Sequence, residues 1–309
     1  MIKIKLCFFL LMITAPSLIW ACDICGCGTG SYYVGILPEF KKRFIGMRYQ
    51  HKSMVTGLNA AGGRSYMTSD EQFHIAELWG AINLSSKFRL MGFVPYNINQ
   101  RLNQGEITNK NGLGDIAVYG YYNIFDNRSV TSNKQLFVHS LWGGIAVKLP
   151  TGNYNHNDRN VIANVQNTFQ LGTGSTDLMF NIMYDLRLQD AGLNTNISYK
   201  LNSANSDEYR FGNKFTANLL AYYKFSLGYQ KNWAPNTGFM LEQSSKDVRD
   251  GKRVVEVSGG HALVYSVGSE WALGNISLGI NYQIPVIQQL AQGKIRANNR
   301  LMVHVSCSF

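Results

Sequence analysis

The last ten residues of the chain, 300–309, restrict its fold more than any other stretch. Every second position is apolar, at Leu301, Val303, Val305, Cys307 and Phe309. The residues between them include Arg300, His304, Ser306 and Ser308. Side chains of a β-strand point alternately to its two faces, so this pattern predicts a strand with one apolar and one polar face. An aromatic last residue also indicates that this end of the chain is docked.

The same period of two recurs upstream. In 176–188, for example, Leu178, Phe180 and Ile182 alternate with Asp177 and Asn181. Together with the terminal stretch, the pattern predicts twelve strands, the others lying at about 43–51, 72–84, 87–100, 113–125, 134–149, 176–188, 193–202, 213–225, 227–241, 260–273 and 276–287. Most have about ten residues or more, whereas strands of soluble sandwiches usually have about five or six.

The predicted links alternate in length. Long polar links are centred near Gly62, Gly105, His156, Asp207, Asp247 and Gly293. Short links lie at 85–86, 126–133, 190–191, near 226 and at 274–275. Long loops at one rim, short turns at the other and an even strand count are typical of outer-membrane barrels with both termini in the periplasm. The predicted fold is therefore all-β: a transmembrane antiparallel β-barrel of about twelve strands, an up-and-down meander over 43–309. A soluble β-sandwich is the alternative.

Composition narrows the class further. Of 309 residues only 16% are charged, and no apolar run of 18 residues occurs. Ordinary transmembrane helices are excluded, whereas barrel strands conceal their apolar residues in alternation. The formal net charge is +10, but the basic residues are scattered singly. This distribution argues against a nucleic-acid partner.

The N-terminus predicts export. Lys3 and Lys5 precede an apolar stretch from Leu6 to Trp20, and Ala21 then precedes Cys22. This pattern is that of a secretory signal peptide over residues 1–21. Ordinary cleavage after Ala21 is favoured over a lipoprotein signal with lipid on Cys22. A Cys-rich, flexible periplasmic segment over 22–42 would follow.

The first candidate for chemistry is the Cys-x-x-Cys-x-Cys group formed by Cys22, Cys25 and Cys27. Thiolates at this spacing can converge on Cu or Zn from one short loop. In an oxidising compartment the same cysteines can instead form disulfides, with Cys307 at the same rim as a further partner, or Cys22 can carry lipid. Metal, disulfide and lipid remain alternatives at this point.

The second candidate is a set of charged or titratable side chains predicted on the inner face of the barrel: Arg48, Glu77, Arg89, Asp115, Asp177, Asp185, Lys200, Lys214, Glu270 and His304. In a narrow lumen they could form a selectivity constriction. Alternatively, they neutralise one another as an ion-pair network, because buried charges need partners.

Aromatic residues near strand ends are predicted to form the girdles at the two membrane interfaces: Tyr96, Tyr121, Tyr122, Trp142, Tyr222, Tyr223 and Trp271. The six histidines are dispersed, and no nucleophile or zinc-protease motif occurs. We therefore predict no enzyme activity.

Two resemblances refine this interpretation. The end of the chain resembles the C-terminal strand of bacterial outer-membrane barrels, which implies that Phe309 is a signal to the barrel-assembly machinery. Four segments resemble the outer-membrane transporter family named for the MetA pathway of phenol degradation: Gly112-Leu-Gly-Asp115, Leu149-Pro-Thr-Gly152, Gly172-Thr-Gly-Ser-Thr-Asp177 and Glu208-Tyr-Arg-Phe-Gly212. This second resemblance implies an outer-membrane barrel that passes small molecules, including hydrophobic ones. The Cys-rich start does not belong to that pattern.

The sequence thus predicts a porin-like barrel in the outer membrane of a Gram-negative cell, surrounded by lipid, that passes a small, hydrophobic or metal-related solute. The alternative is a metal-binding outer-membrane anchor whose cysteine segment docks a periplasmic partner.

Overall fold

The computed structural model describes residues 42–130, 135–156 and 167–309. The first eight strands are β1 (Phe44–Thr56), β2 (Ser69–Asn83), β3 (Phe88–Asn103), β4 (Glu106–Leu113), β5 (Ala117–Val130), β6 (Leu136–Lys148), β7 (Asp177–Leu188) and β8 (Ala191–Leu201). The remaining strands are β9 (Lys214–Tyr223), β10 (Phe225–Gly228), β11 (Lys231–Ser244), β12 (Val248–Arg249), β13 (Arg253–Val254), β14 (Gly260–Leu273), β15 (Ile276–Leu290), β16 (Ile295–Ala297) and β17 (Arg300–Ser308).

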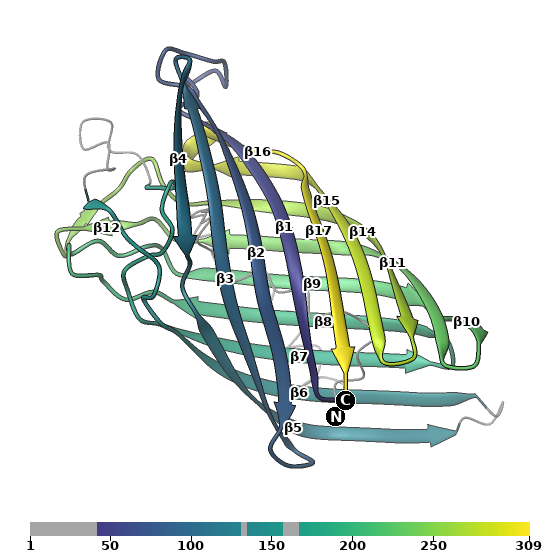
Figure 1. Ribbon diagram of the computed structural model, residues 1–309. Helices are drawn as coiled ribbons and strands as arrows, with labels where there is room; N and C mark the ends of the chain where they lie inside the picture. Colours follow the sequence, from purple (N-terminus) through teal and green to yellow (C-terminus); the bar gives the residue numbers. More distant parts are fainter. Residues whose placement is uncertain (1–41, 131–134, 157–166) are drawn as a thin grey trace, which may run out of the picture.

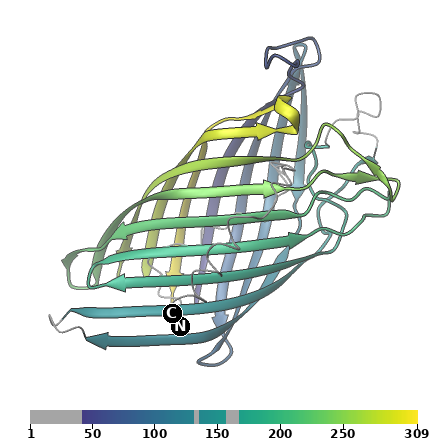
Figure 2. The same ribbon diagram turned by 180° about the vertical axis from the view of Figure 1, so that it is seen from behind.

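The main sheet closes on itself as an antiparallel barrel (Figures 1 and 2). Its fifteen strand segments occupy twelve positions, because β4 with β5, β9 with β10, and β16 with β17 each share one position. The terminal strand β17 pairs with both β15 and β1 and so closes the wall, as predicted. The short hairpin of β12 and β13 is a separate sheet.

Alternation decides which residues face the lumen. In β1, Phe44 and Arg48 are buried, whereas Ile45 and Met47 between them are 53% and 62% exposed. A wall that turns isoleucine and methionine outward is stable only where that surface meets an apolar medium. The outer face is therefore built for lipid. No helix within the described residues is long and apolar enough to span a membrane.

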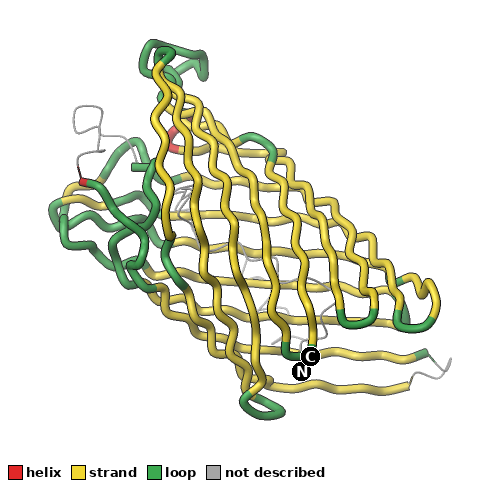
Figure 3. The backbone as a smooth tube through the Cα atoms, viewed as in Figure 1, coloured by secondary structure: helices red, strands yellow, loops and turns green. Residues whose placement is uncertain are grey.

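The two rims differ (Figure 3). Loops gather at one end, where residues 57–68, 149–156, 167–176, 202–213, 245–259, 291–294 and 298–299 lie, and short turns such as 84–87, 189–190 and 274–275 lie at the other end. We call these the loop rim and the turn rim. The backbone N–H of Phe309 donates to the Arg43 carbonyl oxygen at 3.0 Å, so the strand closure reaches the last residue.

Two details differ from the prediction. The link near Gly105 is a tight turn between β3 and β4 rather than a long loop, because both strands extend beyond the main wall. The strand predicted over 113–125 is broken at 114–116, between β4 and β5. A bulge between Asn123 and Phe125 also shifts the register of β5 against β6.

Candidate functional site

All ten residues of the predicted inner set lie on the lumen face of the barrel. Nine of them are buried, and Asp185 is partly buried. Seven of them belong to three clusters of charged side chains described below. Each of these clusters includes a partner that the sequence analysis did not select.

The first cluster spans three adjacent strands near the turn rim. Arg48 of β1 lies opposite Glu77 of β2 on one side and His304 of β17 on the other. Arg48 and Glu77 form a buried ion pair. The guanidinium also lies over Trp79, 5.3 Å from the ring centroid, and His304 packs edge-on against the same ring. Gly279 faces His304 with no side chain, because a Cβ there would lie 2.1 Å from the imidazole.

The second cluster unites three of the family-like motifs; we call it the motif cluster: Asp115, Lys148, Gly152, Gly172, Thr173, Ser175, Asp177 and Lys200. Lys148, at the end of β6, places its ammonium 2.6 Å from Asp115 Oδ2 and 2.8 Å from Asp177 Oδ2. Asp115 also accepts hydrogen bonds from the backbone N–H of Gly152 at 3.0 Å and of Thr173 at 2.9 Å. The loop segments that contain Gly152 and Thr173 thus both donate hydrogen bonds to one buried carboxylate.

Two glycines of this cluster are required by close approach. A Cβ on Gly172 would lie 2.4 Å from Asp115 Oδ1 and 2.6 Å from the Gly152 Cα. The two glycine backbones therefore pass each other where no side chain fits. This contact explains physically why glycine recurs in both motifs.

The fourth motif belongs to a neighbouring cluster. Tyr209 donates its hydroxyl hydrogen to Asp247, and the backbone N–H of Gly212 donates to the same carboxylate at 2.8 Å. Asn205 connects this loop to the motif cluster, because its amide donates to the Thr173 carbonyl oxygen at 3.0 Å. The loops at this rim therefore hold one another in place.

The loop between β6 and β7 also packs against the inner wall at the loop rim. Asn97 and Asn99 of β3 donate their amides to the carbonyl oxygens of Leu171 and Gln170, at 2.8 and 3.1 Å. Phe169 of this loop is buried beneath the Arg101 guanidinium, which lies 4.3 Å from its ring centroid. The described part of the loop thus folds inward and does not project away from the barrel.

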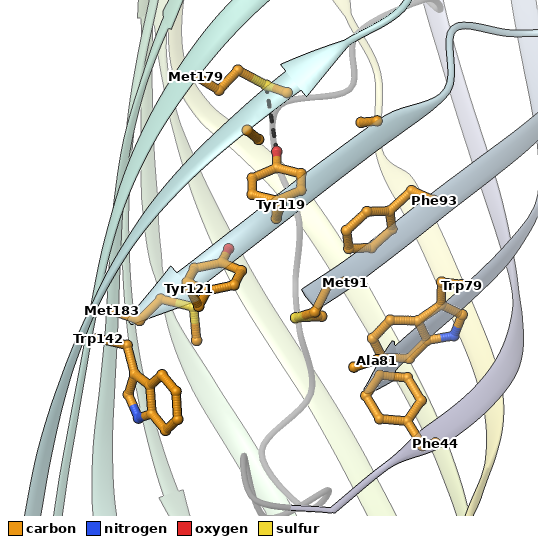
Figure 4. Close-up of a cluster of buried hydrophobic side chains, with 12 residues drawn as sticks. Phe44, Trp79, Ala81, Met91, Phe93, Tyr119, Tyr121, Trp142, Met179 and Met183 are labelled. Carbon is orange, nitrogen blue, oxygen red and sulfur yellow. Dashed lines mark hydrogen bonds between the residues drawn. The ribbon is translucent and has the colours of Figure 1, made fainter. Parts of the chain in front are cut away.

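The lumen face of strands β1, β2, β3, β5, β6 and β7 has a second, apolar lining (Figure 4). We call it the aromatic–methionine cluster; its buried members are Phe44, Trp79, Ala81, Met91, Phe93, Ala117, Tyr119, Tyr121, Trp142, Ala146, Met179 and Met183. Tyr119 points at Met179 and donates its hydroxyl to the sulfur at 3.4 Å. The rings of Tyr119 and Tyr121 stack, with their centroids 5.7 Å apart.

This cluster corrects part of the girdle prediction. Tyr121, Trp142 and Tyr222 were expected at the membrane interfaces but are buried on the lumen side. Tyr96, Tyr122 and Tyr223 do face outward, at 45%, 40% and 46% exposure. The prediction from aromatic residue type alone was wrong for these three residues. The alternation of inward and outward positions, which separates Tyr121 from Tyr122, assigns them to the correct face.

A fourth charged cluster lies on β9, β11 and β17. Glu242 binds Arg300 at 2.7 Å and Lys214 at 3.3 Å between nitrogen and oxygen, with all three side chains almost fully buried. Lys148, Glu242 and Arg300 were missed as site residues. The alternation of inward and outward positions along their predicted strands could have assigned Lys148 and Arg300 to the inner face. Glu242 lies one residue beyond the predicted end of its strand.

The predicted metal ligands Cys22, Cys25 and Cys27 lie outside the described residues. Within the described ranges, no group of three or more His, Cys, Asp or Glu residues could hold a metal ion. Cys307 is a free thiol on the exposed face of β17.

Comparisons with known proteins identify similar structures. The crystal structure of an outer membrane channel from Pseudomonas putida F1 matches with a TM-score of 0.60 and 14% sequence identity, covering 96% of this chain and 100% of that one. The β domain of the Bordetella autotransporter BrkA matches with a TM-score of 0.47 and 12% identity, covering 87% of this chain and all of that one. No curated protein matches the sequence.

The first structural match shows that the fold, a closed antiparallel barrel of twelve strands, is that of an outer membrane channel. A family described as "putative MetA-pathway of phenol degradation" matches residues 64–292, most of the chain. These residues include all four motifs that suggested the resemblance. The chain therefore belongs to the family of the putative MetA pathway of phenol degradation.

Proposed function

We propose that the protein is an outer-membrane channel through which small hydrophobic solutes, including aromatic ones, enter the cell. The observation that supports this best is the aromatic–methionine cluster. A channel for polar solutes needs hydrogen-bonding groups or water along its wall. Here twelve buried apolar or aromatic side chains line one region of the lumen instead.

The chemistry of the cluster suits such a solute. Aromatic rings interact favourably with other rings, face to edge or offset. Met91, Met179 and Met183 have flexible, polarizable side chains that adjust to ligands of different shape. A small apolar molecule could replace contacts within the cluster one at a time as it moves through.

Location and orientation complete the proposal. The apolar outer wall lies in the outer membrane, with the loop rim outside the cell and the turn rim, with both termini, in the periplasm. Residues 1–21 act as the export signal, and Phe309 directs the chain to the barrel-assembly machinery. Metal binding at the N-terminal cysteines is not part of the proposal, because no described residue favours it. We assign no catalytic residue.

The charged clusters have a supporting role in this function. Arg48, Glu77 and Asp177 each have a buried ionic partner of opposite sign. Paired charges of this kind organise a lumen without making it hydrophilic. We therefore favour the ion-pair interpretation for these three residues over a selectivity constriction.

Uptake by whole cells tests the proposal. Gram-negative cells lacking the gene receive the wild-type barrel, an empty vector or a variant, and entry of the apolar dye N-phenyl-1-naphthylamine is followed by fluorescence. The wild-type barrel should raise the initial rate severalfold over the vector. Met183→Lys, which places a charge in the cluster, should abolish the increase, whereas Met183→Leu should preserve it. Equal rates with vector and wild-type barrel at equal surface expression would refute the proposal.

A further inference from the structure

The outer wall of the barrel contains a groove of about 650 Å³, which we call the outer groove. Its lining includes Phe88, Gly120, Tyr122, Gly143, Phe180 and Tyr199, from strands β3, β5, β6, β7 and β8. Tyr122 lies opposite Phe88 on one side and opposite Gly143 on the other. Ile182 of β7 follows beyond Gly143. The outer groove therefore runs across the strands and not along them.

Two glycines on the outer face open this groove. Gly120 and Gly143 face outward, because side chains alternate along a strand and the adjacent Tyr121 and Trp142 are buried on the lumen side. A Cβ on Gly120 would have its nearest described neighbour at 3.8 Å, and one on Gly143 would meet Ile124 Cδ1 at 3.4 Å. A larger side chain at either position would thus extend into the groove and fill it.

The lining of the outer groove suits a flexible apolar chain. Phe88, Phe180 and Tyr199 are exposed on the outer wall, where the barrel meets lipid. Lipid tails are as apolar as these side chains, so close packing decides what binds here. A chain on a flat wall touches protein on one side only, whereas a chain in a groove touches it on several sides. The groove therefore holds a lipid chain more firmly than the surrounding wall does.

The length of the outer groove matches one leaflet of the membrane. It crosses five neighbouring strands, and four intervals of about 4.8 Å give a length of about 19 Å. Because strands of a membrane barrel tilt by about 45°, a groove perpendicular to them descends about 13 Å through the bilayer. Half of a hydrocarbon core about 30 Å thick is about 15 Å. One acyl chain of a single leaflet thus fits the groove.

One end of the outer groove indicates where the head group lies. Phe88 begins β3 directly after the turn 84–87 at the turn rim, and Lys87 of this turn is exposed. A lysine at the membrane surface places its ammonium among the head groups, where it attracts phosphate. The chain of such a lipid can then extend from the turn rim along the groove.

We propose that the outer groove binds one phospholipid, with an acyl chain between Phe88 and Tyr199 and the phosphate at the Lys87 ammonium. This site lies on the outer wall and goes beyond the proposed function. Only the choice of leaflet rests on the orientation proposed above, in which the turn rim faces the periplasm. The periplasmic leaflet of an outer membrane consists of phospholipid, whereas the outer leaflet contains lipopolysaccharide.

Native mass spectrometry of the purified full-length barrel in detergent tests the site. The barrel is incubated with palmitoyl-oleoyl-phosphatidylethanolamine and purified again, and the wild type should retain one molecule. Gly120→Leu should lower the retained fraction about tenfold, which corresponds to the loss of roughly ten close atom pairs. Gly92→Leu is the matched control, because Gly92 lies outside the groove lining and a Cβ there meets nothing within 4 Å in the described ranges. It should retain the lipid as the wild type does.

Two further variants complete the test. Gly143→Leu fills the outer groove from the neighbouring strand and should act like Gly120→Leu. Lys87→Gln should lower retention about fivefold, because one lysine near a membrane surface contributes about 1 kcal/mol. A gel shift between unboiled and boiled samples verifies that each variant is folded.

Several results would overturn the proposal. These are a wild type that retains no phospholipid, equal retention in the wild type and both leucine variants of the groove, and retention of lipopolysaccharide in place of phospholipid. A mass of two protein chains in the wild type that is lost in Gly120→Leu would also overturn it, because a second copy would then cover the groove. Unchanged retention in Lys87→Gln would refute the position assigned to the phosphate.

Discussion

The aromatic–methionine cluster and the motif cluster lie in one lumen but are held together by different forces. The first consists of apolar and aromatic side chains whose contacts are mostly non-directional. The second joins several loops through a fixed pattern of ion pairs and hydrogen bonds around Asp115 and Asp177. Non-directional packing tolerates exchange at similar volume, whereas a buried polar network fails when one member is lost. The motif cluster should therefore be far less tolerant of substitution.

The largest effect is expected for Asp115→Ala. It removes one of the two carboxylates that neutralise Lys148 and leaves the N–H groups of Gly152 and Thr173 without their acceptor. Breaking a buried ion pair on one side costs about 3–5 kcal/mol of unfolding free energy. The measurement is the urea midpoint at which the unboiled, fast-migrating band disappears on a detergent gel.

Asp185→Ala is the matched control for this change. It also removes a lumen carboxylate, but one that is partly exposed and accepts hydrogen bonds from Asn194, at 3.4 Å, and from Tyr222. The expected loss is about 2 kcal/mol, typical of two hydrogen bonds. Similar losses in the two variants would break the distinction between the motif cluster and the other lumen charges.

A smaller effect is expected for Gly172→Ala. The added methyl group would meet Asp115 Oδ1 and the Gly152 Cα, so one of the two loops must move. Overpacking of this kind costs about 1–3 kcal/mol. Gly92→Ala is the control, because a Cβ there meets nothing within 4 Å and its cost should stay within about 0.5 kcal/mol. The same gel titration serves for both, and equal midpoints would contradict the close-approach argument.

The sequence predicted the wall of the barrel better than its interior contacts. Period-two alternation assigned residues such as Arg48 and Glu77 to the inner face, and the register of β1 with β2 brings them together. The alternation of side chains between the two faces depends on the backbone of one strand alone, so it can be predicted from a single sequence. The even number of strands was also predicted correctly, and so was the alternation of long and short links except at the tight turn near Gly105.

The contacts made by the loops could not be predicted in this way. Asp115 and Lys148 lie at the ends of the neighbouring strands β5 and β6, and Thr173 joins them because the loop after β6 folds back. The pattern within one strand does not specify which loop residue packs against its end. Strand ends were the other weakness: Lys52 and Glu242 each lie one residue beyond a predicted strand, so they were left out of the inner set.

The smallest effect is expected within the aromatic–methionine cluster. Met179→Leu keeps the side-chain volume and removes only the weak hydrogen bond that Tyr119 donates to the sulfur. Exchanges that conserve volume usually cost less than about 1.5 kcal/mol. The urea midpoint should therefore fall by less than in Gly172→Ala, and dye entry should remain close to the wild-type rate. A loss as large as that of Asp115→Ala would mean that this cluster is also held by directional contacts, because a non-directional lining has no reason to distinguish leucine from methionine.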